Sequence, residues 1–316
     1  MGDLRDIKVG ILKGGISGER KISFLSGEQA SLALRRKGIN VVDIIIDSSD
    51  ESVIKSLICK ESIDLAFIAL HGEFGEDGGI QSILDDLDIP YTGSSPRASY
   101  LAMNKIASKI IFIKRGIPTP SFFVLDRLVD IDDEMISFPK VVKPYYSGSS
   151  LGVSIVKNYQ DYRQAIIKAF TINDRVIVED YIYGKELTVG ILDDKPLSVV
   201  EIIPKQSYYD FDAKYTDGLS EFNAPAPLPS HIYKKIMEIG FSAHSALGCR
   251  HFSRVDIRLD PEGIPFVLEV NTIPGLTSHS LLPLCAKVCG IGFDELILKM
   301  VELAYNEKKK EQRASV

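Results

Sequence analysis

FSRVDIRL at residues 252–259 and PFVLEVN at residues 265–271 are two strand-like segments close together near the C-terminus. The linker between them, DPEG at 260–263, is rich in turn-forming residues. The two segments are therefore predicted to pair as adjacent strands of a β-hairpin. Because side chains alternate between the two faces of a strand, each segment is expected to turn its apolar residues one way and its polar residues the other.

The polar face of this predicted hairpin carries residues suited to a divalent metal. Arg254 and Asp256 share a face of the first strand, and Glu269 shares a face with Asn271 on the second. A hard cation such as Mg2+ prefers oxygen ligands, which two carboxylates and one amide supply. A solvated strand face with a surface ion pair is the commoner outcome for an isolated hairpin of this kind. The metal site is favoured here because small polar residues suited to ligand contact follow at 277–280.

Composition indicates a globular protein with more than one domain. The chain has 316 residues, of which 45% are hydrophobic, enough for two or three domains with their own cores. The formal net charge is −6, from 37 basic and 43 acidic residues, and the one basic run, at 308–310, is short. This balance gives no sign of a nucleic-acid-binding surface, so no nucleic-acid partner is expected.

Nothing in the sequence predicts a membrane or secretory location. No apolar run approaches the length of a transmembrane helix, and the charged N-terminal segment runs straight into a strand-like stretch, unlike a secretory signal. The cysteines at 59, 249, 285 and 289 form no CxxC pair, so reduced thiols in the core are expected. We therefore expect a cytoplasmic protein without a membrane partner.

Residues 1–95 are expected to form an N-terminal α/β domain with a parallel sheet. Short apolar runs rich in β-forming residues are separated by stretches long enough for helices. After the first run, the glycine-rich GGISGER at 14–20 leads into a helical span at 22–37. The predicted strands are 7–12, 41–46 and 64–70.

Two further units are expected, at residues 96–183 and 184–316. The first alternates helices and strands, with predicted ranges 99–115, 138–144, 151–156, 161–170 and 174–182. The second begins with a hairpin that turns at 193–195. An aromatic, charged and proline-containing stretch without clear period, 205–229, is predicted to be a lid or a disordered loop. The remaining predicted elements are strands 186–192 and 196–204 and helices 233–247 and 293–308.

A loop of small residues between two predicted strands is suited to phosphate binding. In KPYYSGSSLG, residues 143–152, backbone N–H groups can approach phosphate oxygens closely, and Lys143 adds a positive charge. The loop is not a Walker A motif, because GxxxxGK[ST] is absent and a strand follows rather than a helix. A hairpin turn without a ligand is an equally good interpretation of the loop alone. Together with the predicted hairpin at 252–271, which we call the metal hairpin, the loop favours a nucleoside-triphosphate site.

Further polar residues stand at strand ends, where ligands often bind. Glu179 and Glu186 are acceptors suited to an adenine amino group and ribose hydroxyls, although a glutamate at a strand end is usually just exposed. HGEFGEDGG at 71–79 follows a buried strand at the carboxyl edge of the predicted parallel sheet, and GGISGER lies at the same edge. Glu19 in that loop either contacts a ligand or merely caps the following helix.

Eight sequence blocks stand in a fixed order along the chain. The blocks are GGISGERKISFLSG (14–27), HGEFGEDGGIQ (71–81), IPYTGS (89–94), MNK (103–105), KPYYSGSSLGVS (143–154), YDFDAKY (209–215), SRVDIRL (253–259) and LEVNTIPGLTSHSL (268–281). In this order they resemble the D-alanine–D-alanine ligases, which are members of the ATP-grasp fold. The resemblance runs from about residue 9 to about residue 300, with one departure at Asn104, where relatives commonly have Asp.

The resemblance implies a fold that is α/β and α+β in class, an ATP-grasp fold in three domains. Residues 1–95 would form the N-terminal parallel α/β domain, which binds substrate and precedes the ATP-grasp unit. Residues 96–183 would form the central ATP-grasp subdomain with the phosphate flap. Residues 184–316 would form the C-terminal subdomain with the lid and the metal site. The resemblance also implies ATP and D-alanine as substrates, two Mg2+ ions that Mn2+ can replace, and a homodimer.

By similarity, each block contributes residues to one site. The implied ATP-binding residues are Lys105, Lys143, Ser150, Glu179, Tyr181, Ile182, Glu186 and Lys214. The implied ligands of the two Mg2+ ions are Asp256, Glu269 and Asn271, with Glu269 bridging. The implied catalytic residues are Glu19, Ser149, Tyr215, Arg254 and Gly275, and the implied substrate contacts are His71, Ser280 and Leu281.

The implied roles follow the two D-alanine molecules. Glu19 would hold the ammonium group of the first, with His71 near its carboxylate. Ser280 and the backbone of Leu281 would meet the carboxylate of the second. Arg254 and the backbone N–H of residue 275 would stabilise the oxyanion, and Ser149 with Tyr215 would link flap, lid and Glu19.

The implied activity is ATP-dependent ligation of two D-alanine molecules through an acyl phosphate, for peptidoglycan precursor synthesis. A second candidate is another ATP-grasp carboxylate–amine ligase, for example one forming D-Ala-D-Ser or D-Ala-D-lactate. Such an enzyme explains the flap and the metal hairpin but not HGEFGEDG and GLTSHSL, and Tyr215 favours an amino acceptor. A third candidate is an ATP-binding regulatory module without chemistry. The intact cluster of charges argues against it, because like charges are costly to keep together.

Overall fold

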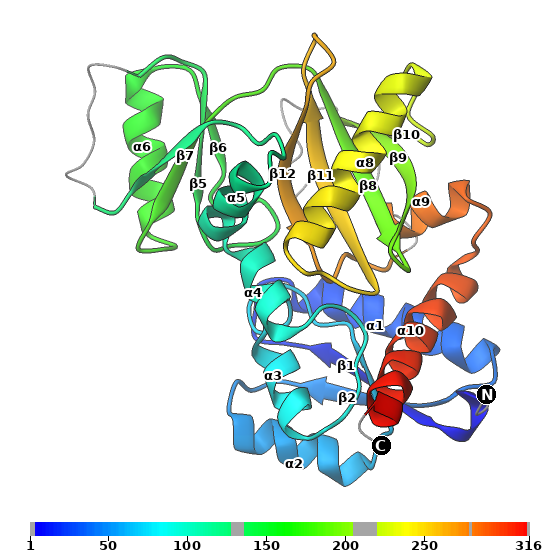
Figure 1. The fold of residues 1–316 in the computed structure, drawn as a ribbon. Coiled ribbons are helices and arrows are strands. Elements are labelled where there is room, and N and C mark those ends of the chain that lie inside the picture. Colours follow the sequence, from blue (N-terminus) through cyan, green and yellow to red (C-terminus); the bar gives the residue numbers. More distant parts are fainter. Residues whose placement is uncertain (1–3, 128–135, 205–219, 278–279, 315–316) are drawn as a thin grey trace.

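A computed structural model describes residues 4–127, 136–204, 220–277 and 280–314 of the chain. It contains three sheets, with strand orders β2-β1-β3, β4-β7-β5-β6 and β10-β9-β8-β11-β12 (Figure 1). The strands are β1 Lys8–Gly14, β2 Asn40–Ile46, β3 Leu65–Ile68, β4 Phe122–Leu125, β5 Lys140–Pro144, β6 Ser154–Val156, β7 Val176–Asp180, β8 Lys185–Leu192, β9 Lys195–Pro204, β10 Ser220–Asn223, β11 Phe252–Leu259 and β12 Pro265–Asn271. The helices are α1 Arg20–Arg36, α2 Glu51–Glu61, α3 Gly79–Asp86, α4 Pro96–Met103, α5 Lys105–Lys114, α6 Tyr159–Phe170, α8 Ser230–Ala246, α9 Leu281–Val288 and α10 Phe293–Ala314, and a short 3-10 helix spans Leu4–Asp6.

The N-terminal sheet is parallel, as predicted. β1 pairs in parallel with β2 on one side and with β3 on the other. The glycine-rich loop therefore leaves β1 at the same edge at which His71 follows β3. Ser23 of α1 ties the two chain segments together, because its Oγ accepts from the N–H of Gly14 at 2.8 Å and donates to the carbonyl of Ala69 at 2.7 Å.

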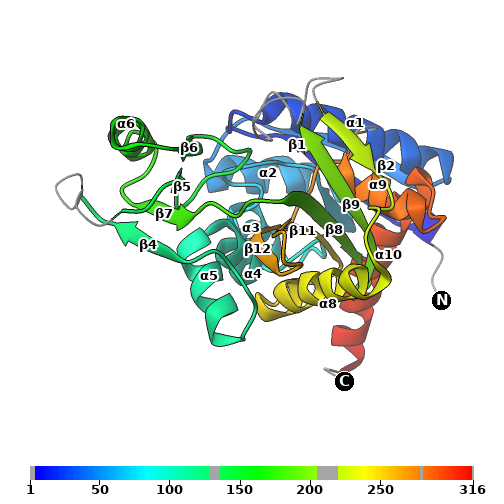
Figure 2. The ribbon, with the colours of Figure 1, turned by 90° about the horizontal axis from the view of Figure 1, so that it is seen from above.

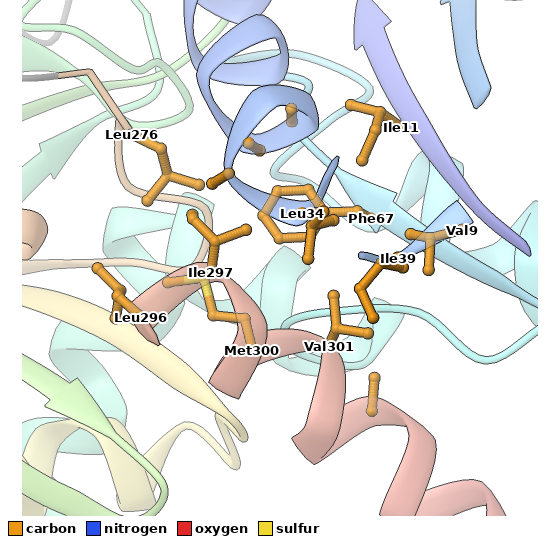
Figure 3. Close-up of a cluster of buried hydrophobic side chains, with 14 of the residues drawn as sticks. Val9, Ile11, Leu34, Ile39, Phe67, Leu276, Leu296, Ile297, Met300 and Val301 are labelled. Carbon is orange, nitrogen blue, oxygen red and sulfur yellow. The ribbon is translucent and has the colours of Figure 1, made fainter. Parts of the chain in front are cut away.

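The last helix, α10, packs against the N-terminal domain, although it is far from that domain in sequence. Residues 296, 297, 300 and 301 of α10 contribute buried side chains to the same cluster as Val9, Leu34 and Phe67 (Figure 3). Figure 1 shows α10 beside α1 at the lower end of the molecule. The N-terminal core is thus completed by the C-terminal end of the chain, which fixes the parallel sheet against the unit that carries the metal hairpin.

The predicted helix at 99–115 is wrong in one respect, because the structure has two helices there. The break falls at Asn104, which has an extended ψ of 93° and caps α5 by accepting from the N–H of Ala107 at 3.0 Å. An asparagine at this position competes for the backbone and starts a new helix. As a result, Lys105 begins α5 and its side chain turns toward the centre of the molecule.

The other two sheets are antiparallel, as the predicted hairpins require. β5 pairs with β6 around the small-residue loop, and β8 pairs with β9 around the turn at 193–195. β11 lies between β8 and β12. We call the sheet of β4, β5, β6 and β7 the central sheet. In the view of Figure 2, the central sheet and α6 lie apart from the sheet of β8, β9, β11 and β12. Helix α5 lies between the two sheets, beside β12.

The prediction of a lid or disordered loop for all of 205–229 is wrong at residues 220–223. Residues 220–223 form strand β10, which pairs with the edge of β9. Residues 205–219 lie outside the described part of the chain. The period was obscured because the strand is short, with prolines following at positions 225 and 227.

The expectation of reduced core thiols holds for two of the four cysteines. All four are free, but only Cys249 and Cys285 are buried, whereas Cys59 and Cys289 are exposed. Burial raises the pKa of both the Cys249 and the Cys285 thiols to about 12.

Among the helices of the described residues, none has the length and apolar character needed to cross a membrane.

Candidate active site

The β11–β12 hairpin brings the four predicted metal-site residues together. The register pairs Arg254 with Asn271 and Asp256 with Glu269. From residue 254 onward the alternating burial of β11 also matches the prediction, since Val255 and the other apolar residues are buried while Arg254, Asp256 and Arg258 stay partly exposed. A register shift after Asp256 was not predicted. Leu268 and Glu269, which lie at this shift in β12, both line a cavity beside the hairpin.

Each carboxylate of the hairpin has a cation beside it. Asp256 accepts two hydrogen bonds from Arg254, at 2.9 and 2.8 Å, and further ones from the Thr188 hydroxyl at 2.7 Å and the Asn271 amide at 3.1 Å. Glu269 lies 3.3 Å from the ammonium of Lys105.

The donor set fits a hard cation that shares its coordination with another ligand. The side chains of Asp256 and Glu269 are 13% and 24% exposed, so their oxygens are accessible. No group of three or more His, Cys, Asp and Glu side chains gathers to hold a metal within the described residues. The polar face of the paired strands offers the carboxylates of Asp256 and Glu269 and the Asn271 amide, which matches a Mg2+ ion that retains waters and substrate phosphates.

A cavity of about 150 Å³ opens between the central sheet and the sheet that carries the hairpin. Its lining combines the small-residue loop, the end of β7 and the metal hairpin, which are far apart in sequence. Nine of the residues predicted for ATP and metal binding line it: Lys105, Lys143, Ser150, Glu179, Tyr181, Ile182, Glu186, Asp256 and Glu269. The sequence blocks therefore converge on one cavity.

Glu179 lies almost fully buried at the inner wall of this cavity, with 3% of its side chain exposed. Burial by itself would raise its pKa, but the ammonium groups of Lys143, at 2.5 Å, and Lys109, at 2.8 Å, outweigh it and hold the pKa below its ordinary value. Glu179 is thus an ionised acceptor. Burial lowers the pKa of Lys109 to about 8.

The opposite wall is organised by Arg258, which had no predicted role. Its guanidinium donates to Glu186 at 3.2 Å and to the carbonyl of Ile182 at 3.1 Å. It also lies over the ring of Tyr181, 5.5 Å from the centroid. One arginine therefore positions the strand end and the carboxylate expected to contact adenine and ribose. Its place in β11, two residues beyond Asp256, was the available signal.

The small-residue loop between β5 and β6 reaches across to the N-terminal domain. The hydroxyl of Ser149 donates to the carboxylate of Glu19. Ser149 and Ser150 both adopt left-handed backbone conformations, with φ of 48° and 58°, which form the tight turn at the tip. A smaller pocket lined by Glu76, Lys105, Ser147, Gly148 and Glu269, among others, adjoins this contact. Lys105, Ser147 and Glu269 line both pockets, so the two are neighbours.

His71 is buried at the end of β3, in a network that the sequence did not reveal. Its Nε2 lies 3.0 Å from the Ser26 hydroxyl, and its Nδ1 lies 3.2 Å from Glu76 and 3.1 Å from the carbonyl of Ile273. Burial raises the pKa of Glu76. The contact with Ile273 connects the N-terminal domain to the segment that follows the metal hairpin.

That segment also brings Gly275, Ser280 and Leu281 together. Ser280 precedes α9 as its N-cap, and its hydroxyl accepts from the N–H of Thr277 at 2.9 Å. A Cβ on Gly275 would lie 2.9 Å from this hydroxyl, so the backbone passes close to it. The free N–H groups at the start of a helix favour an anion such as a carboxylate. Lys214 and Tyr215, the predicted lid residues, lie outside the described part of the chain.

Comparison with known proteins agrees with the resemblance over nearly the whole chain. Residues 51–94 match the family described as D-ala D-ala ligase N-terminus, and residues 111–302 match D-ala D-ala ligase C-terminus. The D-alanine–D-alanine ligase of Geotalea uraniireducens is 44% identical over 307 residues, covering 96% of this chain and 97% of that protein. The ligase of Carboxydothermus hydrogenoformans is 40% identical, covering 96% and 100%.

Solved structures of similar proteins have the same fold. D-alanine–D-alanine ligase from Bacillus anthracis, complexed with ATP, superposes with a TM-score of 0.84 at 33% identity, covering 96% of this chain and 99% of that one. VanG D-Ala:D-Ser ligase from Enterococcus faecalis superposes with a TM-score of 0.80 at 29% identity, covering 94% and 99%.

Proposed function

The chain belongs to the D-alanine–D-alanine ligase family, and from this membership we propose that it joins two D-alanine molecules into D-alanyl-D-alanine with ATP as the energy source. The fold is accordingly an ATP-grasp fold. The dipeptide product serves peptidoglycan precursor synthesis. Formation of a D-Ser or D-lactate product is not favoured, because the relatives from Geotalea uraniireducens and Carboxydothermus hydrogenoformans, at 44% and 40% identity, are named D-alanine–D-alanine ligases.

One observation carries the proposal: the nucleotide cavity and the small pocket beside Gly148 share a wall. Lys105 and Glu269 line both the cavity that holds Glu179 and the small pocket beside Gly148. Ser149, next to Gly148, reaches Glu19. A γ-phosphate in the first space therefore lies next to an amino acid in the second, as transfer between them requires.

In the first step, a carboxylate oxygen of one D-alanine attacks the γ-phosphorus of ATP, and the bond to the β-phosphate oxygen breaks to release ADP. Lys105 and Lys143 neutralise phosphate charge from the cavity side. Glu19 pairs with the ammonium group of this D-alanine, with buried His71 near its carboxylate. The product is an acyl phosphate, which water hydrolyses readily, so the flap at Ser149 must exclude water.

In the second step, the amino group of the other D-alanine attacks the acyl carbon, the tetrahedral intermediate expels phosphate, and the proton lost by the new amide nitrogen leaves on that phosphate. Negative charge develops on the former carbonyl oxygen. Arg254 and the N–H of residue 275 are the proposed donors that stabilise it; loss of one such donor typically costs about 2.7 to 4 kcal/mol of barrier. The start of α9, at Ser280 and Leu281, would hold the carboxylate of the incoming amino acid.

We also propose that Asp256, Glu269 and Asn271 hold two Mg2+ ions, which Mn2+ can replace. When bound, the metal neutralises charge on the phosphoryl oxygens. The chain itself contributes the paired register of the two carboxylates and the hydrogen bonds from Arg254 that orient Asp256. Lys214 and Tyr215 are proposed lid residues on the same basis of resemblance.

The division into domains 1–95, 96–183 and 184–316 is proposed because each range contains one complete sheet. A homodimer is proposed as well. Leu25 and Leu32 lie seven residues apart on one face of α1 and are 49% and 43% exposed, which offers an apolar surface to a second copy. Light scattering on wild type and on Leu32→Lys tests this. The four free cysteines suit a reducing cytoplasm, the proposed location.

The decisive experiment measures phosphate release from Mg-ATP with three amino acid mixtures: D-alanine, L-alanine, and D-lactate with D-alanine. With D-alanine we expect phosphate release and a dipeptide product, and with L-alanine we expect neither. The mixture of D-lactate and D-alanine should yield no ester product. Release that ignores the configuration of alanine contradicts the proposed substrate. ATP binding without any release points instead to the regulatory module.

A further inference from the structure

Lys109 is a buried cation that the proposed reaction leaves without a task. Its side chain is 0% exposed. Its ammonium lies 2.8 Å from Oε2 of Glu179, donates to the Thr119 hydroxyl at 2.8 Å and approaches the carbonyl of Pro120 at 3.4 Å. A lysine is stable in such a buried position only when it is paired, so the role of Lys109 has to be sought in its partners.

The two lysines on Glu179 differ in what surrounds them. Lys143 lines the nucleotide cavity and stands at the base of the flap, whereas Lys109 is not part of the cavity lining. Lys109 is anchored from behind, because the Thr119 hydroxyl that accepts its hydrogen bond donates in turn to the carbonyl of Val267 in β12, at 2.8 Å. Lys143 can therefore turn to a phosphate, while Lys109 is held in place.

The charge state of Glu179 decides which purine suits the site. An ionised carboxylate only accepts hydrogen bonds, so it favours the exocyclic amino group of adenine and repels the carbonyl oxygen of guanine. A protonated carboxyl could donate to guanine, and a misoriented one would contact neither base. Selection for a 6-amino purine thus requires a cation that stays on Glu179 when Lys143 contacts phosphate.

We propose that Lys109 is a positioning residue that sets base specificity: it keeps Glu179 ionised and oriented so that the site takes adenine nucleotides and rejects guanine nucleotides. This inference rests on the proposed function, since it takes Glu179 to be the base contact. It adds a residue that does not touch the nucleotide itself. The hydrogen bonds from Lys109 to Thr119 and from Thr119 to Val267 also connect Glu179 to β12, the strand that carries the predicted metal ligands Glu269 and Asn271.

The test is Lys109→Met, which keeps the length of the side chain and removes its charge. Isothermal titration calorimetry with Mg-ATP and with Mg-GTP, without D-alanine, measures both affinities. We expect ATP affinity to fall by about tenfold to a hundredfold and the ATP-to-GTP preference to shrink by at least tenfold, since hydrogen bonds to charged groups contribute at this level. The KM for D-alanine should stay within about twofold of wild type, as expected for a change confined to the base wall.

Lys114→Met is the matched control, because Lys114 ends the same helix and is exposed. It should leave both affinities unchanged. Should Lys109→Met fail to fold, Thr119→Val removes only the hydroxyl behind the ammonium and should lower the ATP-to-GTP preference severalfold. An unchanged preference in whichever variant folds overturns the proposal.

The outcome is separable from that of the proposed function. A wild-type protein that prefers ATP but forms no dipeptide would refute the ligase activity and leave the Lys109 test intact. A wild-type protein that forms the dipeptide, with a Lys109→Met variant of unaltered preference, would refute the Lys109 role alone. A wild-type protein that binds ATP no better than GTP would overturn the specificity argument directly.

Discussion

Gly148→Ala should impair use of D-alanine, because there is no room for a methyl group where the flap meets Glu19. A Cβ built on Gly148 lies 3.0 Å from Oε2 of Glu19 and 4.0 Å from the Cα of Gly72. Ordinary carbon–oxygen contacts begin at about 3.4 Å, so the flap or the carboxylate must move by several tenths of an ångström. Ser149, which donates to the same carboxylate, moves with the flap.

The size of the effect follows from the sensitivity of proximity effects to distance. A misplacement of about 1 Å can cost about a hundredfold in rate, so a shift of several tenths of an ångström should lower kcat/KM for D-alanine by about tenfold, or about 1.4 kcal/mol. The affinity for ATP should fall less than this, since the added methyl group meets Glu19 and Gly72 rather than Glu179 or Lys143. Phosphate release at saturating ATP, measured against D-alanine concentration, gives the ratio.

Gly18→Ala is the matched control for this experiment. Gly18 belongs to the same loop as Glu19, but a Cβ on it meets no atom within 4 Å. Its kcat/KM should remain within about twofold of wild type. If Gly148→Ala and Gly18→Ala behave alike, the close contact between flap and Glu19 does not govern D-alanine binding, and the reasoning fails.

Two further predictions concern the metal pair and the pH dependence of stability. Glu269→Ala should reduce ATP-dependent phosphate release by more than about a hundredfold, as for loss of a charge-stabilising group, with the unfolding temperature nearly unchanged; undiminished turnover would refute the metal assignment. Burial lowers the pKa of His244 to about 4, so between about pH 6.5 and pH 4 only the unfolded chain takes up this proton and stability falls as pH falls. Urea unfolding at pH 7 and pH 5 should show a loss about 2 kcal/mol larger for wild type than for His244→Gln, and equal losses would exclude His244 as the cause.

The metal hairpin was predictable because its information is local. Alternation along β11 and β12 depends only on residue parity, and the turn at 260–263 indicates which strands pair, so Asp256 and Glu269 were expected on the polar faces of one hairpin. Their direct pairing in the register is a finding of the structure. The register shift after Asp256 was not predictable, since nothing in the neighbouring residues distinguishes a bulged strand from a regular one. The break at Asn104 could have been found, because asparagine is a strong N-cap.

The partners of the site residues were beyond reach for a different reason. Lys109 stands four residues after Lys105 on one helix, a spacing that marks a shared face but not what lies opposite. Its meaning comes from Glu179, seventy residues away on β7, and from Thr119. Glu76, close to His71 in sequence, had a visible spacing but no sign of its burial. Tertiary contacts of this kind depend on how the sheets are placed.

The arrangement of charges suggests how the site exchanges partners without exposing a buried ion. Lys105 lies on Glu269 and Lys143 lies on Glu179, so each ammonium that is proposed to bind phosphate already has a carboxylate partner. When phosphate oxygens bind these ammonium groups, the two carboxylates lose them as partners. Glu269 can then bind the proposed metal, and Glu179 still has Lys109 beside it. Every buried charge then has a partner before and after the exchange. A site with unpaired lysines would bear a larger desolvation cost, and a site whose Glu179 depended on Lys143 alone would lose its base acceptor at the moment of phosphate binding.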